Sequence, residues 1–251
     1  MKRVAILPLS LALGSILLGA VRKPIFGSNS NYTGPVPLHH SGISNGTIAR
    51  AFAFILSNRP DDSAMAVRRE LLEHEAGTYI GDILRERDSS LARWPNRDGN
   101  PLAVWIEPTS DVADFSTEYV QRVRDAFEEW NAVNLPVQFT FVDDSASADV
   151  HVSWIDHFEE PISGRTKWAR DDDWMITDAN IVLALHHSQG DQLDDDSMEA
   201  MALHEIGHLI GLDHTTDSLS IMAPRVRIRQ LSDADRATAR LLYALPPGPK
   251  K

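Results

Sequence analysis

The chain of 251 residues contains no cysteine. Disulfide bonds, zinc sites built on thiolates, thiol nucleophiles and lipid attachment at a cysteine are therefore all excluded. Any bound metal must be held by histidine, aspartate or glutamate, and the fold must be stabilised by packing or by that metal. Because 43% of the residues are hydrophobic, the chain can bury a core of ordinary size.

The chain also has no cluster of lysine and arginine large enough to bind a row of phosphates. Its net charge is −12, and an acidic protein without such a cluster is a poor partner for nucleic acid. We therefore expect no nucleic-acid function. The sequence shows no internal repeat.

The longest uncharged run stands at the N-terminus. After MKR, seventeen uncharged and mostly apolar residues precede VRK. This layout is typical of a secretory signal peptide over residues 1–20, with cleavage after Ala20. It predicts a protein that is secreted or otherwise extracytoplasmic, for example in the periplasm or the cell envelope. Once the signal is removed, no stable membrane association is expected. An uncleaved N-terminal anchor is the alternative, although the run is short for a membrane span.

Residues 21–90 are predicted to be a linker and a helical N-terminal region. Residues 21–46 are rich in Gly, Pro, Ser and Asn without an apolar period, and residues 47–87 have the spacing of two or three short helices. A Pro/Gly turn then leads into a β-type run, so we place the main domain at residues 91–247. The preceding region is either a removable propeptide or a permanent part of the protein.

Within the main domain, alternating and helical patterns follow one another. Strands are predicted at 101–108, 137–144, 148–156, 164–173 and 175–185, and helices at 116–133, 197–212 and 231–245. Asp196, followed three residues later by Glu199, predicts a capping box at the start of the second helix, and Gly211 is expected to end that helix. Ser232 is the expected N-cap of the last helix.

The sequence ALHEIGHLIGLDH at 202–214 begins on the second helix and runs past its predicted end. Four residues advance about 6 Å and slightly more than one turn along a helix, so His204 and His208 share one face and can hold one ion. Glu205 lies about a quarter turn round from His204, near enough to contact a water on that ion without binding the ion itself. Two histidines and a general base are what a zinc hydrolase requires.

A catalytic zinc takes three protein ligands, and His214 is the candidate for the third. In a continuous helix His214 would lie about 240° round from His208 and about 9 Å further along, out of reach. Gly211 tolerates the left-handed conformation that ends a helix, and the chain can then turn back. The alternative is a helix that is rich in histidine by chance. Asp213 either supports a ligand histidine or is a solvated turn residue.

The stretch HEIGHLIGLDH matches the pattern H-E-x-x-H-x-x-G-x-x-H and resembles the metzincin metallopeptidases. Met222 in SIMAP stands where that clan has its methionine turn. Thr215 and the segments VRDAFEEWNAV, ADVHVSWID and LSDADRATARLLY further resemble the catalytic domain of the matrixins, the matrix metalloproteinase type of the clan. The similarity covers about residues 93–244.

The resemblance implies an α+β fold, with a twisted mixed sheet packed on an active-site helix and a C-terminal helix. It implies a secreted, monomeric zinc endopeptidase with one catalytic Zn²⁺ on His204, His208 and His214, and with Glu205 as general base. An extended peptide or protein substrate would lie along an edge strand within GRTKWARD. Residues 224–230 would wall the specificity pocket.

Two other functions stay open: a zinc-containing protein that binds peptides without cleaving them, and a zinc hydrolase that acts on a non-protein amide. A structural zinc or calcium is not assigned, because His151 and His157 do not complete a recognisable ligand pattern. His186 and His187 are expected at the surface. Many matrixins are kept latent by a propeptide cysteine, which this chain lacks, so any latency must arise by another route.

Overall fold

The structure is a computed structural model and describes residues 77–249. The predicted signal peptide, the linker and most of the predicted helical region lie outside the described residues. The elements are α3 (Ile80–Glu86), β1 (Ser90–Leu91), β2 (Leu102–Ile106), α4 (Thr117–Asn131), β3 (Phe139–Phe141), a 3-10 turn (Ser145–Ser147), β4 (Val150–Ile155), β5 (Gly164–Arg170), β6 (Ile176–Ala184), α5 (Asp195–Leu209), α6 (Asp233–Ala244) and β7 (Gly248–Pro249). Within this part of the chain, no helix combines the length and apolarity that crossing a membrane requires.

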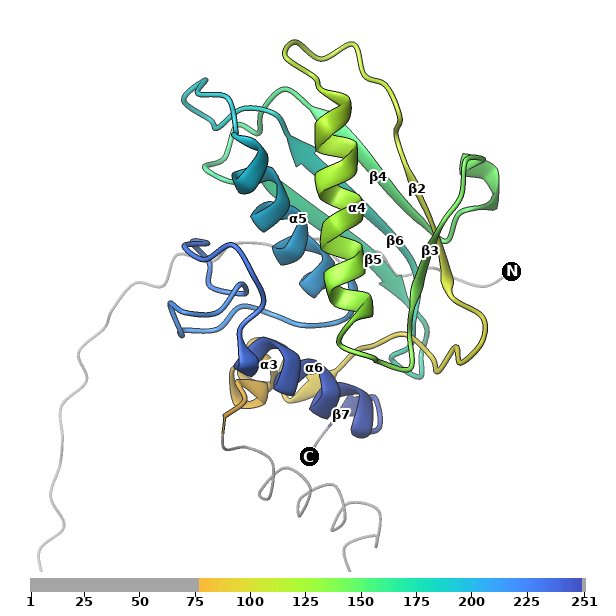
Figure 1. Cartoon of the computed structure of the whole chain (residues 1–251). Coiled ribbons are helices and arrows are strands. Elements are labelled where there is room, and N and C mark those ends of the chain that lie inside the picture. The colour runs from red at the N-terminus through yellow and green to blue at the C-terminus, as the bar shows by residue number, and fades with distance from the viewer. Residues whose placement is uncertain (1–76, 250–251) are drawn as a thin grey trace, which may run out of the picture. The chain divides into compact units, whose positions relative to one another are not determined.

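Five strands form one mixed sheet in the order β3-β2-β4-β6-β5 (Figure 1). The pairs β2·β3, β2·β4 and β4·β6 are parallel, whereas β5 is antiparallel to β6 and lies at the sheet edge. The alternation that predicted the strands is visible in burial, since Val150, Val152 and Trp154 of β4 are buried while the residues between them are partly exposed. The predicted α+β fold with a mixed sheet is confirmed.

Helices α4 and α5 pack side by side on one face of this sheet (Figure 1). The N-cap of helix α4 is Ser116, whose hydroxyl accepts a hydrogen bond from the backbone N–H of Glu118. Its apolar stripe, which includes Phe127 and Trp130, is buried. The indole N–H of Trp130 donates to the backbone oxygen of Leu203 at 2.9 Å, which fixes α4 against the centre of α5.

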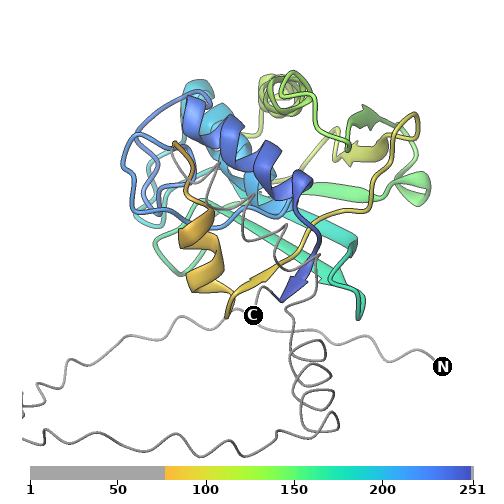
Figure 2. The same ribbon diagram turned by 90° about the horizontal axis from the view of Figure 1, so that it is seen from below.

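The first and last described segments meet at one end of the domain, where α3 lies near α6 and β1 pairs with β7 (Figure 2). The hydroxyl of Tyr79 donates to Asp235 at 3.0 Å, and its backbone N–H donates to the hydroxyl of Thr238 at 3.0 Å. Residues 77–90 therefore pack against the domain that was expected to begin near residue 91. The removal of residues 21–90 as a propeptide stays a prediction.

Candidate active site

Helix α5 brings His204, Glu205 and His208 into the interior of the domain. The helix is apolar on several sides, and most of its residues are buried between α4 and the sheet. Its N-cap is Asp194, whose carboxylate accepts from the backbone N–H of Ser197 at 2.7 Å. The predicted capping box at Asp196 is therefore wrong, because Asp196 already lies in the first turn.

Gly211 ends α5 as the sequence predicted. Its φ is +104°, its N–H donates to the oxygen of His208, and the N–H of Leu212 donates to the oxygen of Gly207. These two bonds form a Schellman motif, in which a left-handed residue satisfies the last carbonyl groups of a helix. A Cβ at Gly211 would also lie 2.2 Å from the backbone oxygen of Ala92. Both the left-handed conformation and the lack of room for a side chain require glycine at this position. After Gly211 the chain turns back toward the helix.

The turn brings the three predicted histidines together. The Nε2 atoms of His204 and His208 are 3.2 Å apart, and the ring of His214 lies 5.3 Å from that of His204 and 4.8 Å from that of His208, between centroids. One nitrogen from each ring lies within 4.8 Å of the others. Two nitrogens on one tetrahedral zinc are about 3.3 Å apart, given Zn–N distances of about 2.0–2.1 Å. The spacing of the cluster suits a single zinc ion.

Hydrogen bonds orient two of the rings for metal binding. The Nδ1 atom of His204 is 2.7 Å from the backbone oxygen of Ile221, and that of His208 is 3.1 Å from the backbone oxygen of Leu212. A carbonyl oxygen can only accept, so both Nδ1 atoms carry the proton and donate it. Each Nε2 then points a free lone pair at the other, an arrangement that a cation between them would stabilise.

The protonation of the cluster also suits a metal. Burial lowers the pKa of His204 to about 4, from an ordinary 6.5. Burial likewise brings the pKa of His208 well below 6.5 and lowers the pKa of His214. The three rings are therefore neutral at pH 7, and neutral imidazole is the form that binds zinc.

The side chain of Glu205, the residue after His204, is held by β5 through a residue that the sequence did not single out. The hydroxyl of Thr166 lies 2.6 Å from Oε2 of Glu205 and 2.9 Å from its backbone oxygen. Gly164 makes room for the same side chain, because a Cβ there would lie 2.5 Å from Oε1 of Glu205. Burial raises the pKa of Glu205 to about 7, and the Thr166 hydrogen bond acts in the opposite direction.

Met222 lies beneath the helix that carries the histidines. A Cβ at Gly207 would be only 2.2 Å from its sulfur, so the thioether packs directly on the helix backbone. The neighbouring Ile221 accepts from His204, and its own N–H donates to Asp235 of α6 at 3.1 Å. The C-terminal helix therefore fixes the segment that orients the first histidine.

The remaining histidines do not gather into a second metal cluster within residues 77–249. The expectation that His186 lies at the surface is wrong, since it is 8% exposed and its ring nitrogens lie 3.1 Å from Asp114 and 2.8 Å from Asp156. His157 contacts the same Asp156 at 2.6 Å. His186 thus connects the loop before α4, the end of β4 and the loop before α5.

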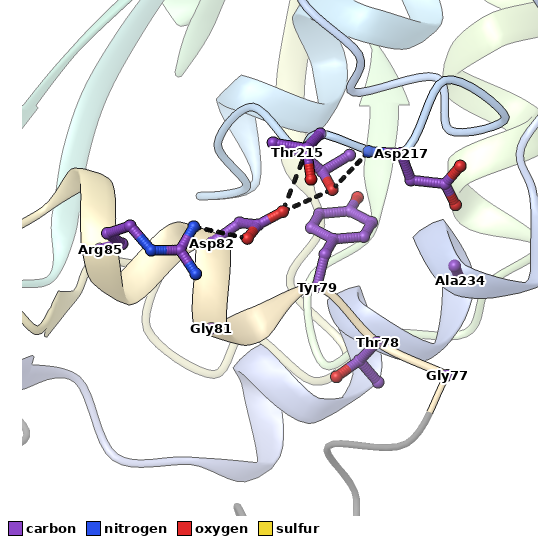
Figure 3. A pocket seen from close by; sticks show the side chains of 10 residues that line it. Gly77, Thr78, Tyr79, Gly81, Asp82, Arg85, Thr215, Asp217 and Ala234 are labelled. Carbon is purple, nitrogen blue, oxygen red and sulfur yellow. Dashed lines mark hydrogen bonds and ion pairs between the residues drawn. The ribbon is translucent and has the colours of Figure 1, made fainter.

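A hollow of about 410 Å³ lies beside α3 (Figure 3). Its lining comes from α3 and from the loop after the third histidine, including Asp82, Arg85 and Thr215. None of the three clustered histidines lines it, and neither does Glu205. We assign no substrate to this hollow, because the groups capable of catalysis lie elsewhere.

Comparison with known proteins gives consistent matches. The matrixin family model matches residues 97–244. Metalloendoproteinase 1-MMP of Arabidopsis thaliana is 31% identical over an alignment of 180 residues that covers 63% of this chain and 46% of that protein. Matrix metalloproteinase-C of Caenorhabditis elegans is 27% identical over 177 residues, covering 63% of this chain and 28% of that protein. The chain thus spans less than half the length of these relatives.

The α+β fold and the histidine motif that begins on α5 define the metzincin class of folds. The family match extends over more than half of the sequence, and the chain belongs to the matrixin family.

Proposed function

We propose that the chain is a zinc-dependent endopeptidase that hydrolyses peptide bonds in peptide or protein substrates. The observation that carries the proposal is the convergence of three neutral imidazoles, with the buried carboxylate of Glu205 on the residue that follows His204. His204, His208 and His214 would hold one zinc ion. Three protein ligands are the number that a catalytic zinc site uses, and they would leave room for water or substrate.

When bound, zinc supplies a Lewis acid that polarises a carbonyl group and makes water more acidic. Glu205 is the general base that takes a proton from the attacking water and passes it to the departing amine. The residue is only 3% exposed, so few water molecules compete for its carboxylate. The hydroxyl of Thr166 donates to Oε2 of this carboxylate at 2.6 Å and thereby orients it.

The substrate is expected to lie along β5. This strand is the edge of the sheet on the side of α5, and its outer backbone groups can pair with an extended peptide. The bond between Thr166 and Glu205 places this edge directly beside the proposed base. Residues 224–230 would wall the pocket for one substrate side chain, an assignment that rests on the family resemblance.

We also propose that the protein is exported and acts as a monomer outside the cytoplasm. The signal-like composition of residues 1–20 supports the proposed export. The names of the relatives, metalloendoproteinase and matrix metalloproteinase, agree with an endopeptidase activity.

The test compares Glu205→Ala with a control, Glu199→Gln, on the same helix. Glu199 is part-exposed and pairs with Arg122 at 3.4 Å, away from the histidines. Glu205→Ala should keep one zinc per chain and lose cleavage of a broad peptide library, whereas the control should retain both. A zinc-loaded wild-type protein that cuts no peptide would favour a binding protein without activity, and cleavage of a non-protein amide alone would favour another hydrolase.

A further inference from the structure

Arg87, at the end of α3, contacts the turn that brings the third histidine into the cluster. Its Nε donates to Oδ2 of Asp213 at 2.8 Å, Nη1 donates to the oxygen of Gly211 at 2.8 Å, and Nη2 donates to the oxygen of Leu212 at 3.0 Å. The guanidinium also lies over the ring of Trp168 of β5, 5.2 Å from its centroid. One planar side chain thus contacts three consecutive residues of the turn.

Asp82, one turn earlier on α3, contacts the other side of the third histidine. Its Oδ2 accepts from the hydroxyl of Thr215 at 2.7 Å and from the backbone N–H of Thr216 at 3.2 Å (Figure 3). The carboxylate is held in turn by Arg85, at 2.8 Å. Residues on both sides of the histidine are therefore bonded to the same helix.

His214 depends on these contacts more than the other two ligands do. His204 and His208 lie on α5 and their rings are oriented by backbone oxygens. Within residues 77–249, the ring of His214 makes no hydrogen bond, and the residue lies outside any helix or strand. The position of its ring is set by the backbone on either side, which Arg87 and Asp82 bind.

Arg87 acts on a second ligand as well. The oxygen of Leu212 that accepts from Arg87 is the oxygen that accepts from Nδ1 of His208. A carbonyl oxygen has two lone pairs and can serve both donors. Loss of the guanidinium would free this carbonyl to move, and the ring of His208 with it. Residues behind metal ligands commonly change metal affinity by about 10–100-fold.

We propose that Arg87 and Asp82 are positioning residues that hold the 211–216 turn so that His214 completes the metal site. The inference rests on the proposed zinc site and deepens it. It follows that residues 79–87 belong to the working enzyme, and that any processing that activates the protein cuts before Tyr79. A chain that began at residue 91 would lack both contacts.

The test measures zinc affinity by competition with a coloured chelator, in the full chain and without any peptide. Arg87→Ala should weaken zinc binding about 10–100-fold. Arg87→Lys keeps the positive charge but loses the planar set of guanidinium donors. Its zinc affinity should therefore lie between those of wild type and Arg87→Ala. The control is Arg124→Ala, since Arg124 of α4 also lies over an aromatic ring, that of Phe141 of β3, and not over the turn.

Circular dichroism of each metal-free variant separates positioning from folding. A folded Arg87→Ala protein whose zinc affinity lies within about threefold of the control overturns the proposal. If Arg87→Ala does not fold, Asp82→Ala in the same assay decides: weakened zinc binding in a folded protein supports the proposal, and unchanged binding refutes it. A wild-type protein that binds zinc but cuts no peptide would refute the endopeptidase and leave this inference standing.

The N-terminus of the active protein gives a second, independent readout. N-terminal sequencing of zinc-loaded, peptide-cleaving material should find a start before Tyr79. An active form that starts at residue 91 and binds zinc as tightly as the longer chain would contradict the inference.

Discussion

Replacing Gly211 with alanine should disrupt the end of α5 and the position of the histidine that follows. At a φ of +104°, an L residue costs about 1–2 kcal/mol. The new Cβ would lie 2.2 Å from the backbone oxygen of Ala92, which cannot rotate away, and such overpacking costs about 1–3 kcal/mol more. The expected loss is therefore about 2–5 kcal/mol, a large part of the roughly 5–15 kcal/mol by which a domain is stable.

The matched control is Gly190→Ala. Gly190 has a φ of +94°, but a Cβ there meets nothing within 4 Å. Both variants lose the same backbone freedom in the unfolded state, so that effect cancels in their difference. Urea denaturation of the metal-free proteins should show Gly211→Ala to be less stable than Gly190→Ala by about 1–3 kcal/mol. Equal losses in the two variants would refute the steric argument.

Three further substitutions test the site. Thr166→Val removes the hydroxyl at nearly constant shape and should lower kcat about 10–100-fold at constant KM. Thr166→Ser keeps a hydroxyl and should recover kcat. An unchanged kcat in Thr166→Val would show that Thr166 is not part of the site. Gly207→Ala should destabilise the metal-free protein by about 1–3 kcal/mol in urea, because its Cβ would displace the sulfur of Met222. The pKa of Glu205 is raised to about 7 from an ordinary 4.5, so the burial of its charge destabilises the fold. This destabilisation is absent below pH 4.5, where the group is protonated in both states, and is complete above pH 7. Metal-free Glu205→Gln should therefore gain up to about 3 kcal/mol over wild type as pH rises through that window, and a difference independent of pH would contradict this.

Local patterns were sufficient to predict the core of the fold and the three histidines that the structure brings together. The periodicity of α5 and the placement of Gly211 follow from neighbouring residues, since helix geometry and a left-handed cap act over a few positions. The N-cap of α5 was misplaced because three consecutive aspartates at 194–196 each offer a carboxylate, and sequence alone does not say which one accepts from Ser197.

Contacts between distant segments could not be predicted in this way. Thr166 is 39 residues from Glu205, and Arg87 is 126 residues from Asp213, so no spacing connects either pair. The two-residue strands β1 and β7 are too short to show an alternation. The burial of His186 depends on carboxylates from two other loops, which the sequence of its own loop does not reveal.

The most direct test of the proposed function is a zinc titration of the chelated protein while peptide cleavage is followed. If one zinc ion on His204, His208 and His214 makes the chain an endopeptidase, cleavage should rise linearly with added zinc and reach its maximum at one equivalent. Cleavage that is already complete in the metal-free protein, or that is absent at every zinc concentration, would contradict that claim.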